Sequence, residues 1–99
     1  MEFLLLTPKE VARSLADRHK TLRLLKKLKR KTLAERSGVS VASLIRFEQQ
    51  AQISLENLLK LFAALGRLDE IDNLLRPPVA KTIDDLEKEE IKTPKRGSI

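Results

Sequence analysis

Apolar residues recur every three or four positions along most of this chain, which is the spacing of amphipathic helices rather than of strands. The pattern predicts a first helix that begins after Thr7-Pro8, with a capping box to Glu10, and runs to about Leu28. Its expected apolar stripe consists of Val11, Leu15, Leu22 and Leu25, with Ala12 and Ala16 alongside.

Four shorter helices are predicted downstream. Two of them, about 30–37 and 41–49, flank a turn at Gly38-Val39, and Ser40 is suited to cap the second. Ser54 can cap a helix over 55–65, which Gly66 ends and whose core-facing residues are expected to be Leu55, Leu58, Leu59, Phe62 and Leu65. A short helix over 68–75 stops before Pro77-Pro78. The prediction is therefore an all-α, five-helix fold.

These helices place a single domain at residues 7–78. Residues 1–6 are predicted to be an N-terminal arm, either an extended segment that pairs with a partner chain or a hydrophobic staple for the first helix. Residues 79–99 are acidic and then basic, and are predicted to be a flexible, partly disordered tail in which 82–91 can form a short helix.

Composition narrows the chemistry that this domain can perform. There is no cysteine and only one histidine, His19, so thiolate metal sites, His-rich metal sites and Ser-His-Asp triads are not expected. The expectation is a protein without a metal or cofactor and without enzymatic activity. The opening MEFLLL lacks the basic start of a signal peptide, and no run reaches the ~20 apolar residues of a membrane span. We therefore expect a bacterial cytoplasmic, nucleoid-associated protein.

Positive charge gathers in the first half of the chain. Residues 1–50 hold 12 Lys and Arg against 5 Asp and Glu, whereas residues 51–99 hold 8 against 9. No acid interrupts the eight basic residues between Arg18 and Lys31. A one-sided basic field attracts polyanions, so nucleic acid is the favoured partner and a membrane surface the lesser one.

The pair of helices around Gly38 has the spacing of a DNA-binding motif. Ala34 is small enough for the next helix to cross closely, and Gly38 can adopt the left-handed conformation that ends a helix. The pattern resembles the helix-turn-helix of the phage-repressor-like (XRE) family, with the motif core Leu33, Ala34, Gly38, Val39, Leu44 and Phe47. The resemblance implies a lambda-repressor-like DNA-binding domain, whereas an ordinary αα-hairpin with the same core pattern is the alternative.

The resemblance also implies roles for individual residues. Base edges would be read by the start of the second motif helix, through Ser40, Val41, Ala42, Ser43 and Arg46. Phosphates would be held by Lys29, Arg30, Lys31, Thr32, Gln52, Ser54 and Asn57. Arg46 has phosphate contact as its alternative role. Arg23 matches an arginine that the family pairs with the glutamate ending the recognition helix, here Glu48.

Members of this family usually read two half-sites as dimers, which implies a homodimer on an inverted-repeat operator. Apolar residues of the short last helix are dimerisation candidates, or else simply pack on the core: Leu68, Ile71, Leu74 and Leu75.

Residues 7–78 are similar in finer detail to HipB-type antitoxins, the regulators encoded beside HipA-type kinase toxins. This likeness implies an autorepressor whose partner is a HipA-type kinase toxin, or a toxin with a separate small antitoxin subunit as in three-gene operons. The chain lacks the tryptophan of the better-known HipB tail. A stand-alone XRE repressor and a protein-interaction module with a vestigial helix-turn-helix are the alternatives.

Overall fold

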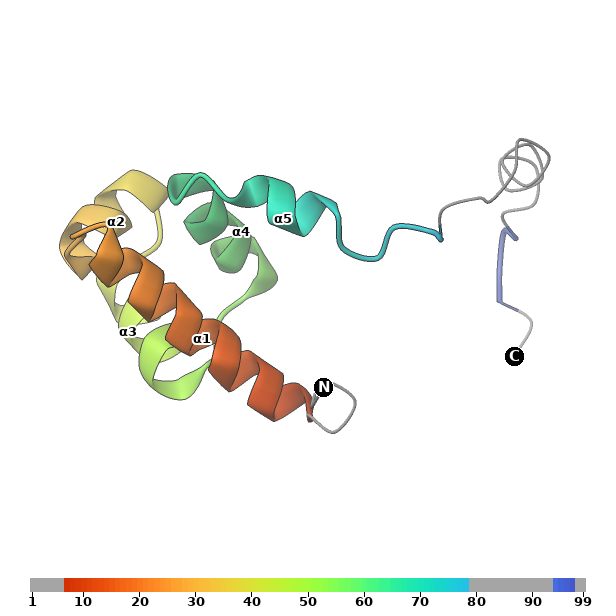
Figure 1. Cartoon of the computed structure of the whole chain (residues 1–99), viewed down its shortest axis with the longest axis horizontal. Coiled ribbons are helices and arrows are strands. Elements are labelled where there is room, and N and C mark those ends of the chain that lie inside the picture. Colours follow the sequence, from red (N-terminus) through yellow and green to blue (C-terminus); the bar gives the residue numbers. More distant parts are fainter. Residues whose placement is uncertain (1–6, 79–93, 98–99) are drawn as a thin grey trace.

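The computed structural model describes residues 7–78 and 94–97. Within them it contains five α-helices and no strand: α1 (Pro8–Leu25), α2 (Arg30–Ser37), α3 (Val41–Gln50), α4 (Leu55–Ala64) and α5 (Leu68–Asp72). The all-α prediction is confirmed. The arm at 1–6 and the segment 82–91 lie outside the described residues. In Figure 1, α1 is the long helix that lies across the bundle, and α5 follows α4 at its edge.

Three of the helices, α1, α3 and α4, begin where a local side chain satisfies one of their first backbone N–H groups. The Oγ1 of Thr7 accepts from the N–H of Glu10 at 3.1 Å, and the Glu10 carboxylate accepts in return from the Thr7 N–H at 3.2 Å. Ser40 and Ser54 cap α3 and α4 by accepting from the N–H groups of Ser43 and Asn57. Caps of this kind stabilise a helix by about 1 kcal/mol each, which makes these boundaries readable from sequence.

The first helix ends three residues earlier than the pattern predicts. Its last turn closes with bonds from Lys27 N to Leu24 O and from Leu28 N to Arg23 O, at 2.9 and 3.1 Å. These are the two bonds of a Schellman motif, and they require a left-handed residue, here Lys27 with φ 57°. Because this position is a lysine and not a glycine, the sequence pattern did not indicate that the helix ends here. The motif turns the chain toward α2 and buries part of Leu28 against the core.

Lys27→Gly is expected to increase the free energy of unfolding by up to about 1 kcal/mol, because glycine carries no Cβ penalty in the left-handed region. Lys26→Gly is the matched control, since it removes the same charge at a residue with φ −82°. Urea denaturation compares the two variants. A gain in both, or in neither, would contradict the assignment of strain to Lys27.

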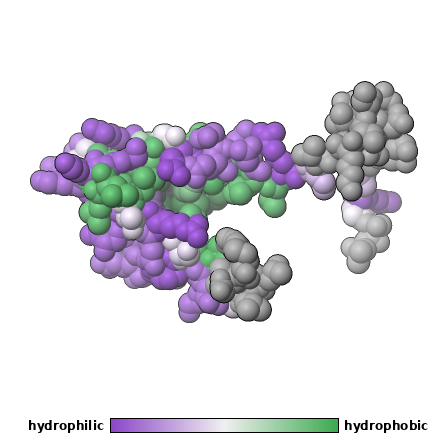
Figure 2. All heavy atoms as spheres, viewed as in Figure 1, coloured by the Kyte–Doolittle hydropathy of each residue, from purple (hydrophilic) through white to green (hydrophobic). Residues whose placement is uncertain are grey.

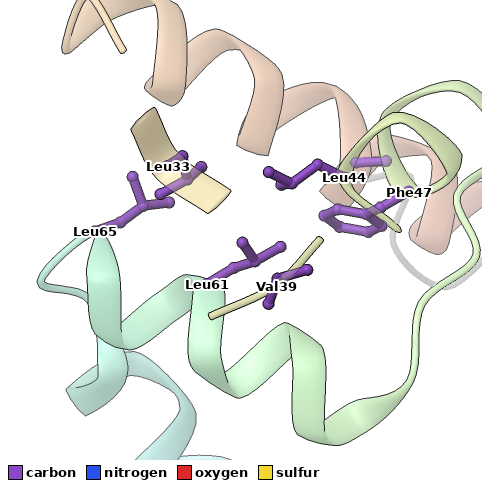
Figure 3. Packing of buried hydrophobic residues seen from close by; sticks show 7 residues of the cluster. Leu33, Val39, Leu44, Phe47, Leu61 and Leu65 are labelled. Atoms are coloured by element: carbon purple, nitrogen blue, oxygen red, sulfur yellow. The ribbon is translucent and has the colours of Figure 1, made fainter. Parts of the chain in front are cut away.

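The core forms where α1, α2, α3 and α4 meet (Figure 3). Seven apolar residues are almost fully buried: Ala16, Leu33, Val39, Leu44, Phe47, Leu61 and Leu65. The close-up view shows the last six of them converging on one another. Ala34 is half-buried and packs against this cluster. Four of the predicted motif-core residues, Leu33, Val39, Leu44 and Phe47, are thus central to the whole domain.

Two helices bring only part of their predicted apolar faces to the core: Leu15, Leu22, Leu58 and Leu65 pack there as predicted, but other predicted residues do not. On α1, Val11 and Leu25 are 48% and 74% exposed, and the fully buried apolar residue is the small Ala16. On α4, Leu55 is 69% exposed, whereas Leu61, which the pattern did not select, is completely buried. Both helices carry more leucine than one face can hold, so only the packing partner decides which leucine is covered.

The last helix is also shorter than predicted, because α5 ends at Asp72 rather than at residue 75. Turns follow, and Leu75 adopts a left-handed φ of 59° with its side chain fully exposed. Of the four dimerisation candidates, only Ile71 is half-buried, while Leu68 and Leu74 are 45% and 63% exposed. Apolar atoms are visible along one side of α4 and α5 in Figure 2.

Candidate nucleic-acid interface

The turn between α2 and α3 sets the direction in which α3 leaves the body. Gly38 adopts the left-handed conformation with φ 78°, and its N–H donates to the carbonyl of Ala34 at 2.9 Å. Leu44 and Phe47 then face inward, both at 2% exposure or less. The other side of α3 faces solvent over its first two turns, with Ser40, Val41, Ala42 and Arg46 exposed and Ser43 half-buried. These are the five residues predicted to read bases, and they share one accessible edge.

Two of the five are already engaged with each other. Ser40 Oγ accepts from the Ser43 N–H at 3.1 Å and donates its own proton to Ser43 Oγ at 2.9 Å. The Ser43 hydroxyl therefore keeps its proton for an outside acceptor, because Ser40 occupies only its lone pair. Val41 and Ala42 offer apolar surface only, which suits a thymine methyl group.

Arg46 is the one charged side chain on this edge, and a neighbour holds it. Its Nε and Nη2 both donate to Gln52 Oε1, at 3.1 and 2.8 Å. The two residues line a small groove of about 250 Å³ between the end of α3 and the start of α4. The remaining lining residues are Ser43, Ile53, Ser54 and Asn57. Three of the predicted phosphate contacts, Gln52, Ser54 and Asn57, are thus brought together with Arg46.

The start of α2 carries the other predicted phosphate contacts. Lys29 and Lys31 are exposed, and Arg30 and Thr32 are half-buried. No side chain caps this helix, and its first turn holds no acid. Cations at the positive end of a helix dipole are unfavourable by themselves, and a bound anion would relieve both the charge and the uncapped N–H groups.

The base of α3 is fixed by a buried carboxylate. Glu48, only 5% exposed, receives bonds from Arg23 Nε and Nη2, both at 2.9 Å, and from Arg30 Nε at 3.1 Å. The Arg23–Glu48 pair expected from the family pattern is therefore formed at bidentate geometry. Burial by itself would raise the pKa of Glu48, but the hydrogen bonds from Arg23 and Arg30 outweigh it and lower the pKa below its ordinary value.

His19 is a third partner of Glu48 that sequence reasoning missed. The ring is 5% exposed, lies edge-on to Phe47 with centroids 5.2 Å apart, and places Nδ1 3.1 Å from Glu48 Oε2. Burial lowers the pKa of His19 more than the nearby carboxylate raises it, so the ring is neutral near pH 7. Nδ1 then carries the proton that Glu48 accepts.

Arg13 is another residue that the sequence did not single out. Its Nη1 donates to the carbonyl of Gln49 at 2.9 Å, its Nη2 donates to the carbonyl of Glu48, and Asp17 braces the guanidinium from the same helix. Carbonyls at a helix C-terminus have no partner within the helix, and a cation there also complements the dipole. Arg13 thus secures the end of α3 that lies opposite the exposed edge.

A helical repeat in α1 could have revealed these contacts. Arg13, Ala16, His19 and Arg23 recur at spacings of three or four, which places them on one face. Three of the four residues are polar, so the apolar pattern of α1 does not include them. The structure shows this face packed on α3, because the buried glutamate there supplies an acceptor for His19 and Arg23.

Other kinds of site are not formed by the described residues. They contain no cluster of three or more His, Cys, Asp or Glu side chains with the geometry to hold a metal ion. None of the helices in 7–78 combines the length and the apolar character needed to cross a bilayer.

Comparison with known families agrees with this geometry. A family model described as HTH_3, helix-turn-helix, matches residues 20–71, which is more than half of the chain and spans α2 to α4 completely. No curated protein and no solved structure matches the chain. The matched segment contains the exposed edge of α3, the basic start of α2 and, of the network around Glu48, Arg23 and Arg30 but not His19. The chain therefore belongs to the XRE-type helix-turn-helix family of DNA-binding transcription regulators.

Proposed function

We propose that this protein is a repressor that binds an inverted-repeat operator as a homodimer. The observation that carries the proposal is the exposed first turn of α3 beside the basic, uncapped start of α2. The first turn of α3 supplies side chains that can contact base edges in the major groove. The start of α2 supplies contacts to the phosphates beside that groove. The network at Glu48 supports it further, because a reading helix must be held rigidly against the body.

Arg46→Ala is expected to relax specificity at one base pair in each half-site and to cost about 1–3 kcal/mol of binding free energy. Arg46 is the strongest hydrogen-bond donor on the exposed edge, and an arginine there can form a bidentate pair with guanine. Binding to a library of operator variants measures the effect. Lys31→Ala is the matched control, since it removes one positive charge from the start of α2. It should weaken binding to every sequence alike and flatten the salt dependence.

If Arg46→Ala left the order of preferred sequences unchanged while reducing all affinities together, Arg46 would be a phosphate contact. The base-reading role would then fall to Ser40, Val41, Ala42 and Ser43, with DNA shape supplying more of the specificity.

The dimer is supported by exposed apolar side chains at the end of the domain. Leu68, Leu74 and Leu75 are each at least 45% exposed and follow one another along α5 and the turn after it. One recognition helix buries too little surface for tight specific binding, so a second copy on an adjacent half-site fits this family. Sedimentation equilibrium with and without DNA tests it. A mass that stays near 11.3 kDa at all concentrations without DNA, together with a single copy bound per whole operator, would exclude a stable dimer.

The finer proposal is that the regulated operon encodes a HipA-type kinase toxin, with this chain as its DNA-binding antitoxin component. Its support is the sequence similarity of residues 7–78 alone. Affinity purification from the host tests it, because a kinase-like protein, alone or with a small second subunit, should be recovered with the chain. A stand-alone repressor would recover DNA without a kinase-like partner.

Sequencing the DNA retained by the purified protein tests the function as a whole. An inverted repeat, most enriched at the promoter of the protein's own gene, is the expected result. Random genomic fragments, with binding that salt removes uniformly, would reduce the proposal to nonspecific DNA binding.

A further inference from the structure

We infer that Gln52 is a positioning residue that presents Arg46 to DNA in one fixed orientation, so that Arg46 reads its base pair through the Nη1/Nη2 end of the guanidinium. The inference rests on the proposed function and adds a specificity-determining residue to it. It also changes the role of Gln52, which the family pattern alone would count among the phosphate contacts.

The hydrogen bonds between the two side chains fix which edge of Arg46 is available. A guanidinium carries five N–H donors in a plane. Nε and one proton of Nη2 point at Gln52 Oε1, at 3.1 and 2.8 Å. The side edge is therefore occupied, and the end edge, formed by Nη1 and the second proton of Nη2, is left to face a guanine. Since arginine has no acceptor, the amide of Gln52 must turn its oxygen toward it.

Gln52 is held in place by the chain on both sides of it. Ala51 ends α3 in a left-handed conformation with φ 54°, and its N–H donates to the Phe47 carbonyl at 2.8 Å. Ile53 packs against the core cluster, and Ser54 caps α4. The residue between them thus projects from a short, anchored connection. A side chain on such a base can hold its partner at a smaller entropic cost than one on a long loop.

Fixing Arg46 before binding should sharpen base discrimination more than affinity. An unrestrained arginine loses side-chain entropy when it orders on DNA, and it can instead turn to the nearest phosphate. With Gln52 in place, the side edge is already occupied, and only the end edge is left to donate to DNA. Arg46 and Gln52 are both exposed, so DNA can reach them without any rearrangement of the core.

The pairing can be tested in the protein without DNA, by NMR of the arginine Nε–H groups. In the wild-type protein the Arg46 Nε–H should exchange slowly with solvent and its side chain should be ordered. Gln52→Ala should abolish both properties. Gln49→Ala is the matched control, because it removes the same side chain from the end of α3, where Arg46 makes no hydrogen bond to it. A mobile Arg46 in the wild-type protein would overturn the inference whatever the protein binds.

A double-mutant cycle tests the consequence for DNA. Gln52→Ala should lower discrimination at the base pair read by Arg46 by about three- to tenfold, a usual coupling for contacting side chains. Affinity for the best operator should fall much less, and thermal stability should not change. In the Arg46→Ala background, Gln52→Ala should have no further effect on discrimination.

A loss of affinity that is equal for all sequences and persists in the Arg46→Ala background would overturn the inference, since Gln52 would then be an ordinary phosphate contact. The protein would still be a sequence-specific DNA-binding protein in that case. Failure of the proposed function looks different, because no variant and no wild-type protein would discriminate among operators, while the NMR result would still report on the pair itself.

Discussion

Glu48→Ala is expected to lower the free energy of unfolding by about 3–5 kcal/mol, the usual cost of removing one partner from a buried ion pair. The carboxylate accepts from Arg23, Arg30 and His19, and Arg23 is itself 95% covered by protein, being 5% exposed. Without Glu48 the guanidinium of Arg23 keeps only the Leu28 carbonyl, 2.8 Å from Nη1. Burying a charge without a counterion costs much free energy, which is why a large loss of stability is expected.

Urea denaturation of the wild type and Glu48→Ala measures this difference. Glu56→Ala is the matched control, because Glu56 makes a surface pair with Lys60 and its side chain is 80% exposed. Exposed pairs of this kind contribute about 0–1 kcal/mol, so that variant should be close to wild type. If Glu48→Ala also cost less than about 1 kcal/mol, Arg23 would have to find water or another acceptor, and the network would not be what anchors α3.

The anchoring also links stability to function. Arg23 and His19 lie on α1, Arg30 on α2 and Glu48 on α3, so one carboxylate joins three helices near the end of α3. Arg30 reaches Glu48 through Nε while its side chain is 30% exposed. Its outer nitrogens therefore remain near the surface where α2 begins. If a phosphate bound these nitrogens, Arg30 alone would join the phosphate to Glu48 and so to the orientation of α3.

Leu61→Ala is expected to destabilise the domain by about 2–5 kcal/mol, the range for truncating a buried leucine. Leu61 is completely buried, and in the core view it lies beside Val39 in the middle of the cluster (Figure 3). Removing three carbons there leaves a cavity beside the turn of the motif. The loss of stability should appear as a lower urea midpoint without a large change in the denaturant dependence.

Leu55→Ala is the matched control, since it makes the same chemical change on the same helix at a side chain that is 69% exposed. It should cost less than about 1 kcal/mol, because little apolar surface is removed from contact with protein. Similar losses for the two variants would mean that α4 packs on the face that its leucine pattern predicts. A larger loss for Leu55 would point instead to an interface between copies that covers this residue.

The starts of α1, α3 and α4 and the motif itself were predictable because local chemistry determines them. Thr7, Ser40 and Ser54 each cap a helix in the structure, and Gly38 adopts the left-handed conformation expected of it. These interactions join residues no more than four positions apart. The apolar positions on either side of Gly38 are also few, so the pattern leaves only one way to turn α2 and α3 inward.

Other features depended on partners that are distant in the sequence. The sequence by itself determined an all-helical domain, its caps and the edge of α3 that faces solvent. Tertiary structure alone decided that Leu61 rather than Leu55 is buried, that His19 and Arg13 serve α3, and that Arg46 is held by Gln52. The physical reason is that a helix rich in leucine, or a polar residue on a helix, has several equivalent positions until another element supplies the surface or the acceptor that makes one of them lowest in free energy.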